Sequence, residues 1–317
     1  MTEPLLVHPG KLHYFVREIF KRLRVPPKDA SKIADVLVAA DLAGVEGQGA
    51  ARLSFHAGRL SARLVNPTPS LEVVEDKAGA LTLDGDNGPG PVVGVKAMEL
   101  AIRRAAKNGI AAVAVRNSNQ PGMLGYYARM AVAEQMMGVA MNNDRPTIVP
   151  PGGTRPMYGT NPIAMAVPTK EGKGPFFLEF TTSSAGRENY GLGLVVDILS
   201  GVLSGGAFGE ELTGAEGDHP AVARIGHFFA ALRIESFGAL APFRERLDLM
   251  LKKLSFSGAR GATRVFYPGE REYEAEEERR ANGIPLSPPV CQELEGLARR
   301  FDLRDAWEHV LASRKGI

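Results

Sequence analysis

Residues 110 to 127 read Ile-Ala-Ala-Val-Ala-Val-Arg-Asn-Ser-Asn-Gln-Pro-Gly-Met-Leu-Gly-Tyr-Tyr. The stretch opens with a continuous apolar run, which is typical of a buried strand, and from Leu124 onward it has the period of a helix. The alternation extends to both sides, with a predicted helix over 92–106, a helix over 124–135 and a strand over 138–142. Strands that alternate with helices in this way indicate the α/β class.

The two ends of the chain have other patterns. Residues 11–64 have helical period, and residues 71–84 read as two short strands around a glycine turn. After residue 225 the pattern is mixed, with expected strands over 228–234 and 263–267, a helix over 242–254 and three terminal helices. We therefore expect three segments, which cover residues 1–75, 76–225 and 226–317.

Composition limits the classes of function. Of the 317 residues, 44% are hydrophobic and 23% are charged, as in ordinary globular proteins. The net charge of +2 and the lack of a long basic tract argue against nucleic acid and anionic membranes as partners, so a small molecule is the expected partner. The N-terminus does not read as a signal peptide, and no run of about 18 apolar residues occurs. With Cys291 as the only cysteine, these features predict a cytoplasmic protein without disulfides or thiolate metal clusters.

A glycine-rich motif invites a nucleotide-binding interpretation. The segment Gly88-Pro-Gly90-Pro-Val-Val-Gly94 follows a predicted strand, as the dinucleotide fingerprint of a Rossmann fold does. The spacing of its glycines differs from that fingerprint, and Pro89 and Pro91 lack the backbone donors that would hold a pyrophosphate. We interpret the segment as a loop that precedes the helix beginning near Val92.

Several motifs together resemble one family. Residues 41 to 52 read Asp-Leu-Ala-Gly-Val-Glu-Gly-Gln-Gly-Ala-Ala-Arg, residues 118 to 122 read Ser-Asn-Gln-Pro-Gly, and residues 159 to 164 read Gly-Thr-Asn-Pro-Ile-Ala. In these motifs the chain resembles the malate/L-lactate dehydrogenase family of NAD(P)-dependent 2-oxoacid and imino acid reductases. The resemblance covers most of residues 8 to 317 and implies a non-Rossmann, mixed-sheet α/β fold with helical N- and C-terminal parts.

The resemblance also assigns a task to each segment. Residues 76–225 would bind the cofactor, NADH or NADPH. Residues 1–75 would pack with residues 226–317 on the side of the substrate and of a second subunit, because members of this family build the active site between paired subunits. A homodimer is therefore expected.

The resemblance further implies a set of cofactor-binding residues around two stretches. One stretch follows a strand, at 179 to 184, where hydroxyls and free amides would hold phosphates. The other is the motif Pro268-Gly-Glu-Arg271, in which a carboxylate could accept ribose hydroxyls. The complete implied set is Gln120, Gly122, Thr160, Asn161, Glu179, Thr181, Thr182, Ser183, Arg187, Gly269, Glu270 and Arg271.

The chain departs from the family pattern in two ways. Family members usually have histidine at the positions of Gln48 and Gln120, so this is a divergent member. They also carry several dozen residues between the phosphate-binding strand and the next helix, which residues 184 to 192 join almost directly here. A lysine expected at that join is missing, and Arg187 could replace it.

The chemistry of a 2-oxoacid reductase requires a cation for the substrate carboxylate, a donor for the carbonyl and a source of a proton. Arg52 would bind the carboxylate. Gln48 and Gln120 can donate hydrogen bonds but cannot release a proton, although both remain catalytic candidates and Gln48 also a substrate contact. His56, four residues after Arg52, is the candidate acid, with Tyr126 and Tyr127 as weaker ones.

Other reactive groups have plainer interpretations. A histidine pair at His8 and His13 could share a metal, but a Pro-Gly turn separates them and no metal site is predicted. Four histidines are expected in the core or at the surface: His13, His219, His227 and His309. Neither Ser118 nor Ser183 lies in a nucleophile elbow.

Three hypotheses for function follow. The first is an NAD(P)H-dependent reductase of a small 2-oxo acid or of a cyclic imino acid, whose C=N group can arrive already protonated. The second is a catalytically silent family member with a binding or structural role, since both family histidines are glutamine. The third is retained chemistry on a ligand whose amide or hydroxyls Gln48 and Gln120 would recognise.

Overall fold

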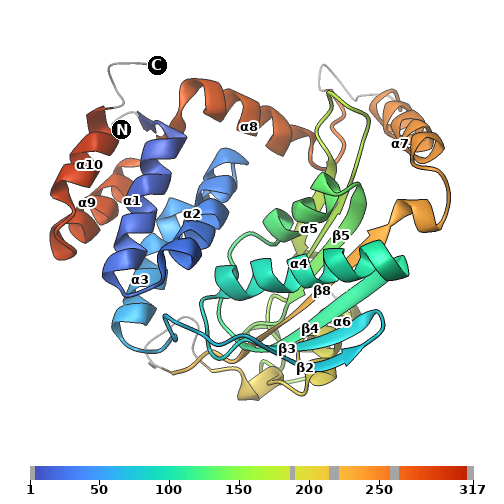
Figure 1. Ribbon diagram of the computed structural model, residues 1–317, viewed down its shortest axis with the longest axis horizontal. Helices are drawn as coiled ribbons and strands as arrows, with labels where there is room; N and C mark the ends of the chain where they lie inside the picture. The colour runs from blue at the N-terminus through green and yellow to red at the C-terminus, as the bar shows by residue number, and fades with distance from the viewer. Residues whose placement is uncertain (1–3, 186–189, 214–220, 258–263, 313–317) are drawn as a thin grey trace.

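The fold has a helical part and a sheet part that lie side by side (Figure 1). The structure is a computed structural model, and it describes residues 4–185, 190–213, 221–257 and 264–312. No helix within these ranges is both long and apolar enough to cross a membrane.

The sheet part is built on seven strands. In spatial order they are β2 (Glu72–Lys77), β3 (Ala80–Asp84), β4 (Ile110–Ser118), β8 (Ile225–Arg233), β5 (Met136–Asn142), β6 (Pro162–Val167) and β7 (Phe176–Thr181). The pair β3 and β4 is parallel, and every other neighbouring pair is antiparallel. The mixed sheet confirms the α/β fold that the sequence predicted.

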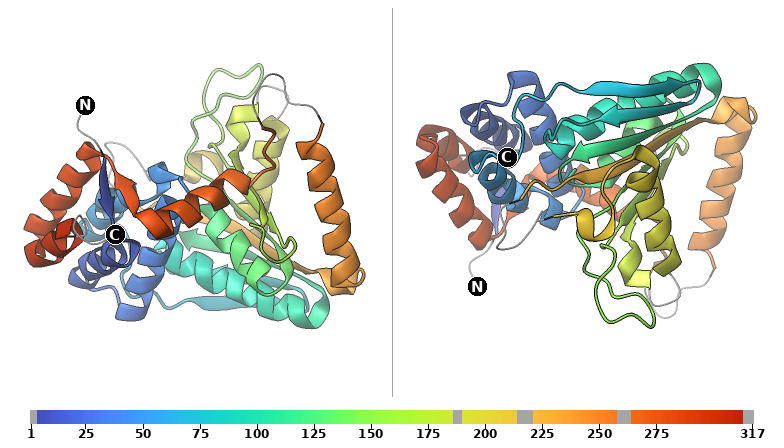
Figure 2. Two further views of the ribbon diagram at one scale, coloured as in Figure 1. Left: turned by 90° about the horizontal axis from the view of Figure 1, so that it is seen from above. Right: turned by 90° about the horizontal axis from the view of Figure 1, so that it is seen from below.

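Helices cover both faces of this sheet (Figure 2). On one face lie α4 (Gly90–Asn108) and α5 (Leu124–Ala133), which bury their apolar sides against β4, β5, β6 and β8. The packing is close, because a side chain at Gly94 of α4 would lie 2.7 Å from the ring of Tyr127 of α5. The other face carries α6 (Tyr190–Ser200). The central strands β4 and β8 are covered on both sides, which is why they read as largely apolar runs.

The start of α4 settles how the glycine-rich motif folds. The helix begins at Gly90, inside the motif, with Pro89 as its N-cap residue and Pro91 in its first turn. Proline is favoured in a first turn because the missing N–H has no helical partner there. The motif is therefore a loop that leads into a helix, as its spacing indicated.

The helical part joins the two ends of the chain. It contains α1 (Pro9–Arg22), α2 (Pro27–Leu42), α3 (Leu53–Ser61), α9 (Pro288–Arg300) and α10 (Arg304–Leu311). A short antiparallel pair, β1 (Leu5–Val7) with β9 (Ile284–Leu286), links its N- and C-terminal elements. Its core includes the rings of Phe15 and Trp307, whose centroids lie 5.3 Å apart.

One helix, α8 (Glu270–Asn282), runs from the sheet part to the helical part (Figure 1). Two ion pairs hold it at both sides. Arg129 of α5 contacts Glu276 at 2.6 Å, and Arg279 contacts Glu46 at 2.7 Å. The helix thus fixes the turn around residue 46 relative to the sheet.

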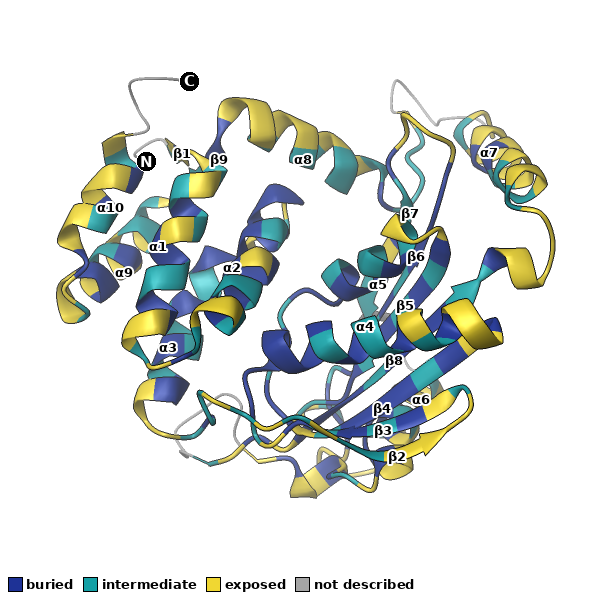
Figure 3. Cartoon of the chain, in the orientation of Figure 1, coloured by how far each residue is buried: buried dark blue, intermediate teal, exposed yellow. Residues whose placement is uncertain are grey.

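The C-terminal third differs from the expected pattern in two places. The boundary expected at residue 226 falls within β8, which lies in the middle of the sheet between β4 and β5, so this strand packs with the α/β segment. The strand expected over 263–267 is not formed at residues 264–267, and residue 263 lies outside the described ranges. The intervening helix α7 (Leu240–Ser255) lies at the edge of the sheet part and is largely exposed (Figure 3).

Candidate active site

The two parts of the fold meet at a cavity of about 460 Å³. Its wall from the helical part is the turn that carries Gln48 and Arg52. Its wall from the sheet part comes from β7, from the start of β6 and from loops at strand ends. The lining residues are Val45, Gly47, Gln48, Arg52, Gln120, Gly122, Asn142, Asp144, Arg145, Thr147, Thr160, Pro162, Phe177, Glu179, Phe180, Thr181 and Glu272. Clefts of this size between two parts of a fold are typical of small-molecule sites.

The turn that carries Gln48 and Arg52 is held by a buried carboxylate. Two short 3-10 turns, η1 (Glu46–Gln48) and η2 (Ala50–Arg52), meet at Gly49. Oδ2 of Asp41 accepts a hydrogen bond of 2.8 Å from the backbone nitrogen of Ala50, and a side chain at Gly49 would lie 2.0 Å from Oδ1 of Asp41. Burial raises the pKa of Asp41 to about 7, and nearby Glu46 adds to the effect.

Arg52 is oriented by an aromatic ring. Its guanidinium carbon lies 4.4 Å from the centroid of the Phe55 ring, and the guanidinium of Arg59 approaches the same ring at 5.9 Å. Cation–π contacts of this kind stabilise a guanidinium in one orientation. The structure thus places a fixed cation at the cavity, together with Gln48 and Gln120.

Gln120 contacts a carboxylate that the sequence analysis did not select. Its Nε2 donates a hydrogen bond of 2.9 Å to Oδ2 of Asp144. Asp144 is the second residue after the end of β5. Side chains just past a strand end are common at active sites of α/β folds. Its position after a predicted strand could have indicated Asp144 as a site residue, but Asp144 belongs to no sequence motif.

His56 lies in an adjoining pocket rather than in the main cavity. That narrow pocket is lined also by Phe55, Arg59 and Gln120, so Gln120 is common to both spaces. Burial, together with the positive charges of Arg52 and Arg59, lowers the pKa of His56 to about 3. The imidazole is therefore neutral at pH 7 and is not poised to act as an acid.

The two tyrosines are no better placed to supply a proton. Tyr127 is fully buried, its hydroxyl donates to the carbonyl of Pro121, and burial raises its pKa well above the usual range. Burial also raises the pKa of Tyr126 to about 12. Both phenols hold their protons too tightly for transfer at neutral pH.

Glu179 lines the cavity and also caps a helix. Its Oε1 and Oε2 accept hydrogen bonds of 3.1 and 2.8 Å from the backbone nitrogens of Leu124 and Gly125 at the start of α5. A carboxylate at a helix N-terminus satisfies free backbone donors and interacts favourably with the helix dipole. Burial nevertheless raises the pKa of Glu179 above its ordinary value.

The comparison with protein families identifies the family of the chain. A sequence model described as malate/L-lactate dehydrogenase matches residues 7–189 and 184–295. The chain belongs to the malate/L-lactate dehydrogenase family. The match divides between residues 184 and 189, which is where the sequence lacks the segment that family members usually carry.

Individual members of the malate/L-lactate dehydrogenase family are similar over nearly the whole chain. The malate dehydrogenase of Pyrococcus abyssi is 35% identical over 93% of this chain and 94% of its own length. The L-sulfolactate dehydrogenase of Methanocaldococcus jannaschii is 28% identical over 94% of this chain and 98% of its own. The solved structure of malate dehydrogenase from Pyrococcus horikoshii matches with a TM-score of 0.88 at 34% identity, and covers 94% of this chain and 96% of that one.

Membership of the malate/L-lactate dehydrogenase family makes the protein an oxidoreductase of the dehydrogenase type that uses a nicotinamide cofactor. Five of the cofactor residues that the family implies line the cavity: Gln120, Gly122, Thr160, Glu179 and Thr181.

Two further cofactor residues that the family implies, Asn161 and Thr182, are buried and connect neighbouring segments through hydrogen bonds. Asn161 is fully buried, and its amide donates to the carbonyl of Gly193 at 2.8 Å and accepts from the nitrogen of Asp144 at 3.1 Å. Thr182 is also buried and donates its hydroxyl hydrogen bond to the carbonyl of Thr160 at 3.1 Å. Neither lines the cavity, and nor does Ser183, whose hydroxyl contacts Oγ1 of Thr181. Arg187 lies outside the described residues.

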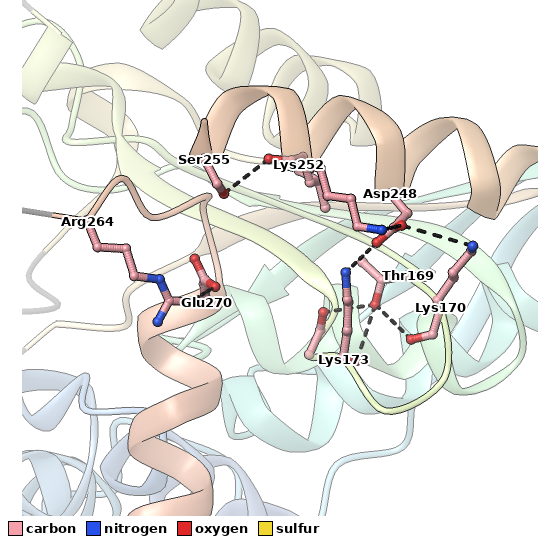
Figure 4. Close-up of polar contacts among 10 residues, drawn as sticks. Thr169, Lys170, Lys173, Asp248, Lys252, Ser255, Arg264 and Glu270 are labelled. Carbon is pink, nitrogen blue, oxygen red and sulfur yellow. Dashed lines mark hydrogen bonds and ion pairs between the residues drawn. The ribbon is translucent and has the colours of Figure 1, made fainter. Parts of the chain in front are cut away.

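The Pro-Gly-Glu motif lies apart from the cavity, near α7 (Figure 4). Glu270 pairs with Arg264 and borders a separate space of about 260 Å³, and the guanidinium of Arg271 lies 4.4 Å from the ring of Phe266. Gly269 has a φ of 93°, and a side chain there would meet the backbone nitrogen of Phe177 at 2.6 Å. In the same turn it is Glu272 that reaches the cavity lining.

The other histidines that the structure describes do not line the cavity. His227 is fully buried in β8, and burial lowers its pKa to about 3. His13 contacts Asp35 at 2.8 Å, and Nδ1 of His8 accepts from the nitrogen of Gly10. His309 lies on α10, and His219 is outside the described residues. The described part of the chain contains no group of three or more His, Cys, Asp or Glu that could hold a metal ion.

Proposed function

We propose that the protein interconverts a small 2-hydroxy acid and the corresponding 2-oxo acid, with NAD(H) or NADP(H) as the redox partner. The observation that carries this proposal is the common cavity of Arg52, Gln48 and Gln120. The named activities of the relatives, on malate and on sulfolactate, support a substrate of this class.

Each of the three side chains has a task that its chemistry allows. The planar guanidinium of Arg52 can bind a carboxylate through two parallel hydrogen bonds, which fixes the orientation of the substrate. The amides of Gln48 and Gln120 can donate to the 2-oxo group and polarise it. Substrate orientation and carbonyl polarisation are thus provided by the turn at 48–52 and the loop at 120.

The cavity lining fits the nicotinamide end of a cofactor. Thr160 and Thr181 supply hydroxyls, and Phe177 and Phe180 supply flat apolar surface. Gly122 has a φ of 76°, which suits glycine and leaves the backbone accessible. When bound, the nicotinamide accepts or supplies the hydride.

A second substrate class is a cyclic imino acid. It is favoured by the two glutamines in the cavity, because a C=N group that is already protonated needs orientation and hydride but no enzymic acid. Oxidation of NADPH by a cyclic imino acid but not by a 2-oxo acid would select this class.

We propose also that the protein is a homodimer that pairs through α6. The outward side of this helix and the turn after it is apolar, with Leu194, Ile198 and Leu203 exposed to 40%, 53% and 57%. The one charged residue of the helix, Asp197, is buried. An uncharged apolar patch of this kind suits an identical surface, which a twofold axis supplies.

The function is tested by assaying malate, sulfolactate and lactate with NAD⁺ and NADP⁺ on wild-type protein, Arg52→Ala and Arg52→Lys. Loss of a charge-assisted contact to a bound carboxylate costs about 2–5 kcal/mol, so kcat/KM should fall at least about 30-fold in Arg52→Ala. The fall should be smaller in Arg52→Lys, which keeps the charge but loses the two parallel hydrogen bonds. The exposed Arg103→Ala on α4 serves as the matched control and should keep wild-type kinetics. Equal kcat/KM in wild type and Arg52→Ala would contradict the assignment of Arg52.

A further inference from the structure

We propose that Asp144 carries the proton of this reaction, accepting it from the substrate hydroxyl on oxidation and returning it on reduction, with Gln120 as its positioning residue. The proposal rests on the proposed function. It assigns a residue to the one task that the glutamines cannot perform, since a carboxamide neither gains nor loses a proton near neutral pH.

The backbone of Asp144 is anchored to the far side of the sheet. Its nitrogen donates to Oδ1 of Asn161 at 3.1 Å, and Nδ2 of Asn161 donates to the carbonyl of Gly193 in α6 at 2.8 Å. Asn161 is fully buried with a φ of 43°, a left-handed conformation that its surroundings hold in place. The chain next to Asp144 is also tight, because a side chain at Gly159 would meet the Asp144 carbonyl oxygen at 2.4 Å.

The carboxylate of Asp144 is oriented at both oxygens. Oδ2 accepts from Nε2 of Gln120 at 2.9 Å, and Oδ1 accepts from the nitrogen of Arg145 at 2.7 Å. A carboxylate offers about four acceptor positions, two on each oxygen, so orientation and proton acceptance do not exclude each other. Groups fixed in this way lose little freedom when the substrate binds.

The other proton carriers near the cavity are less suitable. His56 lies in the adjoining pocket with its pKa lowered to about 3 by burial and by two arginines. Glu179 has a structural role instead, because its two oxygens cap the first amides of α5. The remaining described ionisable groups of the lining are Arg52, Arg145 and Glu272, and the two guanidinium groups do not exchange protons at neutral pH.

Oxidation of the 2-hydroxy acid removes one proton and one hydride from the substrate. On oxidation, the O–H bond of the 2-hydroxy group breaks and its proton passes to a carboxylate oxygen of Asp144. A bound oxidised nicotinamide would take the hydride from C2, and C2 and its oxygen would then form the carbonyl. Asp144 then releases the proton to water before the next turnover.

The test compares Asp144→Asn with wild type in two measurements, kcat/KM for 2-hydroxy acid oxidation and the dissociation constant of NADH from fluorescence titration. Loss of a general base costs on the order of 10² to 10⁴ in rate, so kcat/KM should fall by that factor. The isosteric amide should leave NADH binding within about threefold of wild type, as expected for a group that acts on the proton. Asp305→Asn, which changes an exposed carboxylate of α10 outside the cavity, is the matched control and should keep wild-type kcat/KM.

The outcomes separate the two proposals. An active wild type with an equally active Asp144→Asn would overturn the assignment of Asp144 alone, and so would a variant that loses NADH binding together with turnover. A wild type inactive on every hydroxy acid would overturn the proposed function and the assignment with it.

The positioning role of Gln120 has its own measurement, the pH profile of kcat/KM. Oxidation should fail at acidic pH as Asp144 takes up a proton. The other described ionisable residues that line the cavity with it are Arg52, Arg145, Glu179 and Glu272. A donor to a carboxylate favours its charged form, so Gln120→Leu should move the acidic limb to higher pH. An unmoved limb would contradict this role, and Asp144→Asn should lack the limb altogether.

Discussion

Oδ2 of Asp41 accepts a 2.8 Å hydrogen bond from the backbone nitrogen of Ala50, which ties the end of α2 to the turn that carries Gln48 and Arg52. The same carboxylate lies close beneath Gly49. A buried acid of α2 thus sets the position of the residues proposed to contact the substrate.

This contact makes stability depend on pH. Burial raises the pKa of Asp41 from 3.8 to about 7 in the folded state. Between about pH 4 and pH 7 the folded protein keeps a proton that the unfolded chain has released, so the free energy of unfolding falls by about 1.4 kcal/mol per pH unit from this group. The stabilisation is complete below pH 4 and is lost as the pH rises through 7.

Asp41→Asn should remove that slope, because the amide keeps an oxygen for Ala50 and has no proton to release. Urea unfolding between pH 5 and 8 should show the variant gaining stability relative to wild type as the pH rises. The exposed Asp305→Asn should show no such trend. A constant difference between wild type and Asp41→Asn would contradict a raised pKa.

The two glycines beside Gln48 should respond differently to alanine. A side chain at Gly49 would lie 2.0 Å from Oδ1 of Asp41, whereas one at Gly47 would meet nothing within 4 Å. Gly49→Ala must displace either Asp41 or the turn, so we expect a stability loss of about 1–3 kcal/mol and a higher KM for the substrate. Gly47→Ala should behave nearly as wild type, and equal effects of the two would disprove this account of the turn.

Glu179 should contribute to stability through its cap of α5. Removal of a helix cap costs about 0.5–2 kcal/mol, so Glu179→Ala should lower the free energy of unfolding by at least that amount. Glu179→Gln keeps an acceptor and should lose less. Chemical denaturation checks both, with the exposed Glu171→Ala as the control, and an unchanged midpoint for Glu179→Ala would rule out the cap.

The proposed dimer predicts the effect of charges on α6. Ile198→Asp or Leu203→Asp would place a carboxylate in an apolar interface and should yield monomers in light scattering. Leu249→Asp on α7, whose leucine is exposed to 45%, is the matched surface control and should leave the dimer intact. A wild-type protein that is monomeric at micromolar concentration would contradict pairing through α6.

The sequence predicted the α/β core because local signals determine it. The apolar run from Ile110 and the helical period from Leu124 are each properties of one segment, and both elements form. The place of β8 could not be read in the same way. Strand order depends on contacts between distant segments, and Ile225–Arg233 pairs with strands that precede it by about a hundred residues.

The site was predictable only where residues carried a motif. Gln48, Arg52 and Gln120 meet at the cavity as the family pattern implied. Helical spacing placed His56 near Arg52, but it could not show that burial and two arginines would hold the imidazole neutral. Asp144 was missed because a lone carboxylate between Asn143 and Arg145 has no local signature, and only the fold brings it to Gln120.

The most direct test of the central claim is a spectrophotometric assay of wild-type protein with malate, sulfolactate or lactate and either nicotinamide cofactor. We expect saturable reduction of NAD⁺ or NADP⁺ with at least one of these acids, with a kcat/KM that falls at least about 30-fold in Arg52→Ala. No reduction of either cofactor with any of the three acids would contradict that claim.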